Sequence, residues 1–271
     1  MSETKMPRTT EVGRETPVQV VAKVGALLDQ LAEQGETTAS ELADRIGEPR
    51  STVYRLLATL QHLDMVEPGT RRGTYRLGLA LLRLGSAVVA RFDERQAALP
   101  VMERIHEETG ETVFLCIRRG HDAVCIERLD GRRVQSLALR LGGSLPLHVG
   151  AAPRVLLAFE PEDFWDEYVR SGPLESFTEG TPTTRKSLFA GLHETRERGY
   201  AVSDEDVTLG IAALGAPIYD YRGTLRAALS ISGVRQAILA DSAMTRLVVA
   251  GAEEISRTLG HTSARGSSGD A

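Results

Sequence analysis

The sequence predicts an α+β protein of two domains that meet near residue 95. Before this point, short amphipathic helices accompany one turn-rich hairpin. After it, strand-like runs alternate with helices, and some of the runs pair as hairpins. Such interleaving favours an antiparallel sheet with helices on its faces. The predicted segments are a flexible arm over 1–17, a helical domain over 18–78, a linker helix over 79–95, an α+β domain over 96–260 and a disordered tail over 261–271.

Composition and charge exclude several classes of protein. The 271 residues are 42 % hydrophobic and 25 % charged, which excludes wholesale disorder. With 37 acidic and 32 basic side chains the net charge is −5, so nucleic acid would meet at most a local basic face. Two cysteines exclude a disulfide scaffold and fit a reducing compartment. Because the chain has no run of roughly 18 apolar residues and its start is polar, we expect a cytoplasmic protein with no membrane partner.

Three helices are predicted in the first domain. Apolar residues recur at helical spacing in the first of them, at Val20, Val24, Leu27, Leu28 and Leu31. The second begins with a capping box made by Thr38 and Glu41, and Gly47 ends it. Pro49 suits the first turn of the third helix, where its missing N–H costs nothing.

The third helix has one apolar and one polar face. Its apolar positions follow the i, i+3, i+4, i+7 pattern, at Val53, Leu56, Leu57 and Leu60. Ser51 and Arg55 point the opposite way, with Thr52 and Tyr54 on the flanks. A hairpin with a Gly- and Arg-containing turn follows, so the region has the pattern of a winged helix-turn-helix.

Charge supports a DNA-binding interpretation of this region. Over 49–76 there are five basic and two acidic side chains, a balance of 5 − 2 = +3 within an acidic protein. We expect base-edge contacts from the helix and phosphate contacts from its start and the wing. The predicted DNA-binding residues are Arg50, Ser51, Thr52, Tyr54, Arg55, Arg71 and Arg72. The alternative is a packed mini-domain whose arginines are merely solvated.

The second domain is predicted from its alternation of strands and helices. A hairpin over 111–131 turns at 120–121, a strand follows over 136–142, and two more strands cover 211–219 and 224–232. Helices are expected over 79–96, 99–109, 149–159, 161–169, 184–198 and 241–259.

These residues resemble the IclR family of bacterial transcriptional regulators. The resemblance covers about 18–260 and is carried by an ordered set of motifs: STVYRLLATLQHLDMVEPG, GTYRLGLALLRLG, LPLHVGAAPRVLLAF, RERGYAVSDEDVTLGIAALGAPIYD and GTLRAALSISG. It implies that the second domain is a GAF-like effector-binding domain. It also implies a ligand-responsive transcriptional regulator, and a repressor is one expected mode of action.

A ligand site in that domain has a physical rationale. The N–H groups of Gly150 and Ala151 precede a predicted helix, and helix starts attract carboxylates. Ser230 and Ser232 alternate on one strand, so both hydroxyls face the same side. The resemblance implies that these four positions line the pocket; packing alone is the alternative explanation. His148 is a further candidate, with a satisfied core histidine as its alternative.

Two further pocket positions depart from the family pattern. Relatives that sense small oxo-acids carry Asp and Cys where this chain has Ser203 and Ala213. The loss of an ionic group and a thiol argues against a glyoxylate- or pyruvate-like ligand and favours a larger or more apolar carboxylate.

Other chemistry is weakly indicated. The chain lacks nucleotide-binding, nucleophile-elbow and zinc-protease motifs, so we expect no catalytic residues, no metal and no cofactor. Cys116 and Cys125 are expected to face each other across the hairpin, and a redox-sensing transcription factor is one alternative function. An enzyme with an accessory DNA-binding domain is another. The acidic run over 204–206 is interpreted as a solvated loop face.

The sequence thus predicts a transcriptional regulator whose operator affinity responds to a small organic acid. Because one winged helix covers only a half-site, the expected partners are a pseudo-palindromic double-stranded DNA operator and a second copy of the chain, as a homodimer or a dimer of dimers.

Overall fold

The computed structural model describes residues 19–89, 93–133, 138–240 and 242–262, which divide into two compact units between residues 88 and 89. The predicted arm over 1–17 lies outside the described residues, as does most of the predicted tail over 261–271.

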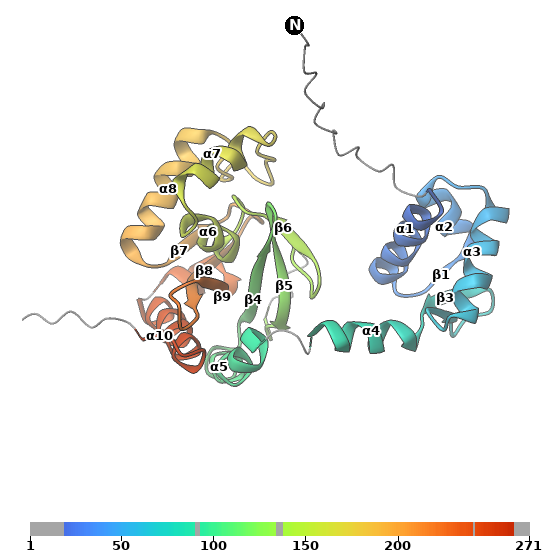
Figure 1. Ribbon diagram of the computed structural model, residues 1–271, viewed down its shortest axis with the longest axis horizontal. Helices are drawn as coiled ribbons and strands as arrows, with labels where there is room; N and C mark the ends of the chain where they lie inside the picture. Colours follow the sequence, from blue (N-terminus) through green and yellow to red (C-terminus); the bar gives the residue numbers. More distant parts are fainter. Residues whose placement is uncertain (1–18, 90–92, 134–137, 241, 263–271) are drawn as a thin grey trace, which may run out of the picture. The chain divides into compact units, whose positions relative to one another are not determined.

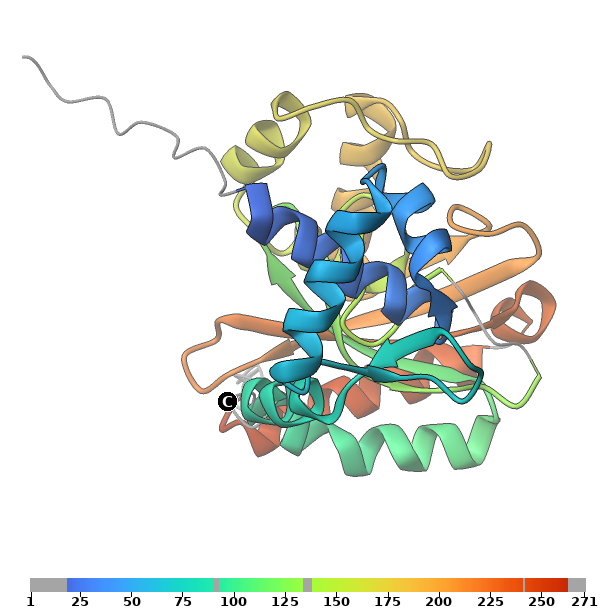
Figure 2. The ribbon, with the colours of Figure 1, turned by 90° about the vertical axis from the view of Figure 1, so that its right-hand side faces the viewer.

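The first unit is a small helical domain with a three-stranded sheet. Its elements are α1 (Gln19–Gln34), β1 (Thr37–Thr38), α2 (Ala39–Ile46), α3 (Arg50–His62), β2 (Val66–Pro68) and β3 (Thr74–Leu77), after which α4 (Leu79–Val89) begins. The strands pair antiparallel in the order β1-β3-β2. Figure 2 shows α3 and the β2–β3 hairpin in light blue to teal.

Local sequence signals explain where these helices begin and end. The Thr38 Oγ1 accepts a hydrogen bond from the Glu41 N–H at 3.2 Å, and the Glu41 carboxylate accepts one from the Thr38 N–H at 2.9 Å, so the predicted capping box is confirmed. Gly47 ends α2 in the left-handed conformation, with φ = 67°. Pro49 occupies the position just before α3, not its first turn. The apolar faces of the three helices meet in one core, which includes Leu27, Leu31, Leu42, Val53 and Leu57.

The second unit is built on a six-stranded antiparallel sheet with the strand order β6-β5-β4-β9-β8-β7. The strands are β4 (Thr112–Arg119), β5 (Asp122–Leu129), β6 (Ser144–Pro146), β7 (Ala201–Asp204), β8 (Ile211–Tyr219) and β9 (Leu225–Val234). This confirms the predicted α+β class with an antiparallel sheet.

Helices cover both faces of this sheet (Figure 1). α5 (Asp93–Thr109) and α10 (Ser242–Thr258) pack on one face, where Met102, Ile105 and Leu229 are fully buried. α6 (Ala151–Ala158), α7 (Glu162–Arg170) and α8 (Arg185–Arg198) lie on the other. The short α9 (Arg235–Leu239) follows β9.

Two predictions for the linker and the second unit are wrong in detail. A strand is predicted over 136–142, but the described residues 138–142 form bends and a turn. Gly142 takes φ = 76°, and its N–H donates to the Cys125 carbonyl, so the chain turns here. The strand in this region is β6, which begins two residues later at Ser144. The boundary between the helices predicted over 79–96 and 99–109 is also wrong, because α5 runs unbroken from Asp93 to Thr109, and acidic residues suit its start; α4 is described as far as Val89. Strand β7 was not predicted.

Candidate nucleic-acid interface and ligand site

The polar face of α3 is open to solvent, as its periodicity predicted. Arg50, Ser51, Tyr54 and Arg55 are exposed, while Thr52 is half-buried on the flank. The opposite face buries Val53 and Leu57 completely, which fixes the rotation of the helix in its unit.

The turn of the wing carries Arg71 and Arg72, and both are exposed. A carboxylate that the sequence analysis missed, that of Glu36, organises this turn. It accepts hydrogen bonds from the Arg71 N–H and the Thr70 hydroxyl, each at 2.8 Å, and from the Thr74 hydroxyl. These bonds, the one from Thr74 foremost, hold the pKa of Glu36 well below its usual range. The side chain of Arg71 reaches within 3.6 Å of the same carboxylate yet stays 72 % exposed, so its guanidinium remains accessible.

The candidate ligand site begins at the first turn of α6. Gly150 precedes the helix with φ = 89°, a conformation that favours glycine. The first N–H groups of a helix have no acceptor within it, and no acceptor for those of Ala151 and Ala152 lies elsewhere in the described residues. α6 sits directly on β8, because a Cβ at Gly215 would lie 3.0 Å from the Ala151 backbone. A side chain at residue 215 would therefore push the helix start away from the sheet.

A cavity of about 50 Å³ opens between this helix start and the sheet. That is several times the roughly 10–15 Å³ that one water needs. Six of the seven predicted pocket residues line it: Gly150, Ala151, Ser203, Ala213, Ser230 and Ser232. The other lining residues are Phe114, Leu139, Ala152, Pro153, Val207, Thr208, Ile211 and Ala212.

The register of the sheet explains why residues so far apart in sequence meet here. Ser203 pairs with Ala213, and Ala213 pairs with Ser232, so the three lie in one row across β7, β8 and β9. Ser230 lies two residues along and pairs with Gly215 on β8. Side chains two apart on a strand face the same side, so both serines point toward α6.

His148 is not among the residues that line this cavity, although it lies two residues before Gly150. Its Nδ1 is 2.7 Å from the Tyr168 hydroxyl and its Nε2 is 2.9 Å from the Glu175 carbonyl. Burial lowers the pKa of His148 and disfavours the charged ring. It is a satisfied buried histidine, the alternative weighed from the sequence.

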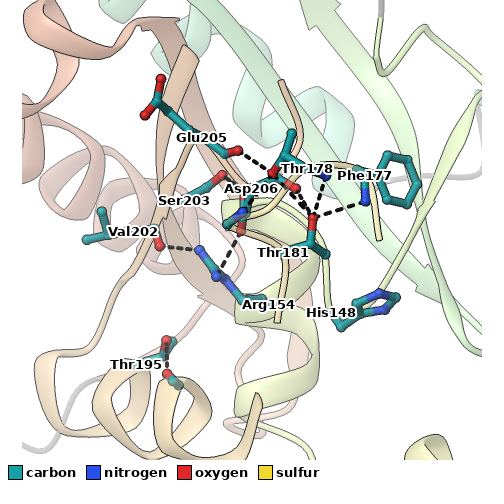
Figure 3. Close-up of polar contacts among 12 residues, drawn as sticks. His148, Arg154, Phe177, Thr178, Thr181, Thr195, Val202, Ser203, Glu205 and Asp206 are labelled. Atoms are coloured by element: carbon teal, nitrogen blue, oxygen red, sulfur yellow. Dashed lines mark hydrogen bonds and ion pairs between the residues drawn. The ribbon is translucent and has the colours of Figure 1, made fainter. Parts of the chain in front are cut away.

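Beside the cavity lies a buried ionic cluster that the sequence analysis did not foresee (Figure 3). Asp206 is 1 % exposed, so the interpretation of 204–206 as a wholly solvated face is wrong at this residue. One carboxylate oxygen lies 2.8 Å from Nη1 of Arg154, and the other accepts a hydrogen bond from the Ser203 hydroxyl. Arg154 also donates to the Val202 carbonyl, so it ties α6 to β7.

Threonines hold the backbone of the same loop in place. The Thr181 hydroxyl donates to the Asp206 carbonyl at 2.7 Å, and the Thr178 hydroxyl donates to the Glu205 carbonyl at 2.6 Å. The loop that carries Val207 and Thr208 into the cavity is therefore fastened to the segment over 178–181, and the ion pair with Arg154 fastens it to α6 as well.

The two cysteines face each other across β4 and β5, as predicted, and both are fully buried. The neighbouring Cys125 thiol and complete burial raise the pKa of the Cys116 thiol well above its usual value. Because the thiolate is the reactive form, this environment disfavours a redox sensor. Among the described residues there is no group of three or more His, Cys, Asp or Glu side chains that could hold a metal ion.

Comparison with known proteins assigns the family. The model for the IclR helix-turn-helix domain matches residues 20–69, and that for the C-terminal domain of bacterial IclR transcriptional regulators matches residues 86–257. The chain belongs to the IclR family of transcriptional regulators.

Relatives of this IclR-family regulator are regulators as well. It is 32 % identical to the HTH-type transcriptional regulator KipR of Bacillus subtilis, covering 90 % of this chain and 98 % of that one. It is 31 % identical to the HTH-type transcriptional repressor AllR of Escherichia coli, covering 95 % and 98 %. These relatives support the assignment of a transcriptional regulator.

Solved structures agree with the fold. The Thermotoga maritima IclR matches with a TM-score of 0.75 and 32 % identity, covering 90 % of this chain and 99 % of that one. An IclR homologue from Microbacterium hydrocarbonoxydans, in complex with 4-hydroxybenzoate, matches with a TM-score of 0.77 and 27 % identity, covering 89 % and 98 %. No helix in the described parts of this chain is long and apolar enough to cross a membrane.

Proposed function

We propose that this regulator binds a small carboxylic acid in the cavity beside α6, and that binding changes its affinity for a DNA operator. The observation that carries the proposal is that the N–H groups of Ala151 and Ala152, which have no acceptor among the described residues, meet the hydroxyls of Ser230 and Ser232. Such donors suit a carboxylate. The 4-hydroxybenzoate complex of the Microbacterium relative supports the same class of ligand.

The walls of the cavity favour an apolar body on that carboxylate. Phe114, Leu139 and Val207 contribute apolar side chains to the lining, and none of the described lining residues carries a charged side chain. The small oxo-acids that related regulators sense would leave these walls uncontacted. We therefore propose a larger or more apolar carboxylate as the effector.

We further propose that α3 enters the major groove of DNA. Ser51, Thr52, Tyr54 and Arg55 would contact base edges, and Arg50 would hold phosphate near the helix start. Arg71 and Arg72 of the wing would contact phosphate or the minor groove. An effector that binds one arrangement of the chain better by roughly 1–3 kcal/mol changes operator affinity about 5–150-fold.

The replacement Ala213→Leu tests the cavity. Ala213 is half-buried and lines the site, so three added carbons would fill the space a ligand needs. We expect benzoate affinity to fall about 10-fold or more in calorimetry, while operator affinity without ligand stays unchanged in a mobility-shift assay. Ala250→Leu, which adds the same atoms at an exposed position of α10, should leave both unchanged. Normal benzoate binding by Ala213→Leu would reject the cavity as the effector site.

We propose a homodimer because α4 exposes large apolar side chains. Leu79, Leu82 and Leu84 are exposed by 73 %, 68 % and 47 %, and α4 has no buried residue among those described. A second copy would cover these leucines and also supply the second half-site reader. A dimer of dimers would extend the same pairing.

The replacement Leu82→Arg should therefore weaken self-association. Burying a leucine contributes roughly 1.5–3 kcal/mol to the free energy of association. We therefore expect analytical ultracentrifugation to show a dimer dissociation constant that is about 10-fold higher or more. Arg83→Gln, at the neighbouring exposed position, is the control and should associate normally. An unchanged sedimentation profile for Leu82→Arg would contradict this use of α4.

A further inference from the structure

We infer that the ligand cavity carries a fixed hydrogen-bond acceptor, the Oγ of Ser203, and that it therefore selects carboxylic acids bearing a hydroxyl group at the end opposite the carboxylate. The inference rests on the proposed effector site and adds the second recognition point of its ligand. Ser203 lines the cavity, is 3 % exposed, and donates its hydroxyl hydrogen to Asp206 (Figure 3).

The direction of that hydrogen bond follows from the ionic cluster. The second carboxylate oxygen of Asp206 is paired with the Arg154 guanidinium at 2.8 Å, and a carboxylate in an ion pair offers lone pairs only. The single hydrogen between Ser203 and Asp206 must therefore come from Ser203. A hydroxyl has one hydrogen and two lone pairs, so what Ser203 can still offer to the cavity is a lone pair.

The acceptor is held in place because Asp206 is held in place. The Thr181 hydroxyl fixes the Asp206 backbone at 2.7 Å, and Arg154 bridges the carboxylate and the Val202 carbonyl. Turning the Ser203 hydroxyl toward a ligand would leave the buried carboxylate without this donor, which is unfavourable. Ser203 thus differs from Ser230 and Ser232, for which no such carboxylate partner lies within the described residues.

The positions of donors and acceptor set the spacing of the ligand's polar groups. The α6 start, with its N–H groups, sits over Gly215 on β8. Ser203 is on the neighbouring strand β7. Its partner on β8 is Ala213, which lies two residues before Gly215. Strand spacing of about 4.8 Å and a rise of about 3.3 Å per residue place Ser203 roughly 8 Å from Gly215. Ala213 pairs with Ser203 on β7 and with Ser232 on β9, and its small side chain lines the cavity.

The charge of the cluster favours a neutral donor over an ammonium group. The negative charge of Asp206 is compensated by Arg154, and both side chains are buried, at 2 % and 13 % exposure. A cationic group at this end would lose its hydration without gaining a free counter-ion. A hydroxyl loses far less and finds an acceptor in Ser203.

Paired ligands of similar size test the inference. Calorimetry on the full-length protein would compare 4-hydroxybenzoate with 4-fluorobenzoate, which keeps the ring and carboxylate but cannot donate a hydrogen bond. We expect the hydroxy acid to bind about 10-fold more tightly or better. In Ser203→Ala the preference should shrink to about 2-fold or less. In Ser230→Ala, which pairs with Gly215 at the donor end, both acids should weaken together and the preference should persist.

The outcomes separate this inference from the proposed function. Equal binding of the two acids by the unmodified protein, or a preference that survives Ser203→Ala, would overturn the acceptor role and leave the effector site standing. Failure of both acids to bind the unmodified protein, or binding that Ala213→Leu does not weaken, would remove the effector site itself, and the acceptor role with it.

Discussion

Replacing Asp206 with alanine should destabilise the second unit by about 3–5 kcal/mol, the usual cost of leaving one member of a buried ion pair alone. The Arg154 side chain is only 13 % exposed, so water cannot replace the lost carboxylate without rearrangement. The Ser203 hydroxyl would lose its acceptor at the same time. Both effects act on the wall of the ligand cavity, so effector affinity should fall as well.

The single tryptophan makes this expectation measurable in a two-unit protein. Trp165 is fully buried in α7 and donates to the Leu157 carbonyl at 2.7 Å, so its fluorescence reports unfolding of the second unit alone. Urea titration followed at this residue gives the free energy of unfolding. The matched control is Asp166→Ala, which removes the exposed Arg185–Asp166 pair and should cost less than about 1 kcal/mol. Equal costs for the two variants would show that the buried cluster does not stabilise the unit.

A double variant separates the ion pair from mere packing. Asp206→Leu combined with Arg154→Met replaces both charges by apolar groups and leaves neither charge buried without its partner. We expect it to recover most of the stability lost in Asp206→Ala, because a buried ion pair contributes little over an apolar pair of similar volume.

Local signals in the sequence were sufficient for the first unit and for much of the second. The capping box at Thr38, the stop at Gly47 and the periodicity of α3 depend on residues within one or two turns of each other. The bounds of β8 were likewise predicted from its own residues. The strand-like pattern over 136–142 gave a wrong prediction of a strand, because glycines at 142 and 143 turn the chain there.

The parts of the site that could not be predicted depend on long-range contacts. Nothing in an acidic run distinguishes Asp206, which is buried, from Asp204, which pairs with Arg235 near the surface. Its partner Arg154 is on a helix far away in sequence. Glu36 organises the wing through residues more than thirty positions later. His148 was misplaced for a related reason: closeness to Gly150 in sequence does not fix which way its ring points.

Replacing Arg55 with alanine should cost roughly 1–3 kcal/mol in operator binding, a loss of about 5–150-fold, and should relax base preference at one position. Arg55 is exposed on α3, and no ion pair within the described residues occupies its guanidinium. An arginine in this position can donate two parallel hydrogen bonds to a guanine edge from a rigid planar guanidinium, a geometry that the flexible ammonium group of lysine holds less well. Arg55→Lys should therefore lose base preference while keeping much of the affinity.

Mobility-shift titrations on the operator, obtained by footprinting the protein's own upstream region, would measure this against scrambled DNA. Arg72→Ala, in the wing, should weaken binding to both DNAs alike and reduce the salt dependence by about one phosphate contact, because a phosphate carries no base identity. Arg170→Ala in α7, outside the DNA-binding unit, is the control for loss of charge alone. If Arg55→Ala left both affinities unchanged, α3 would not be the element that reads the operator, and the exposed arginines of this unit would be only solvated charges.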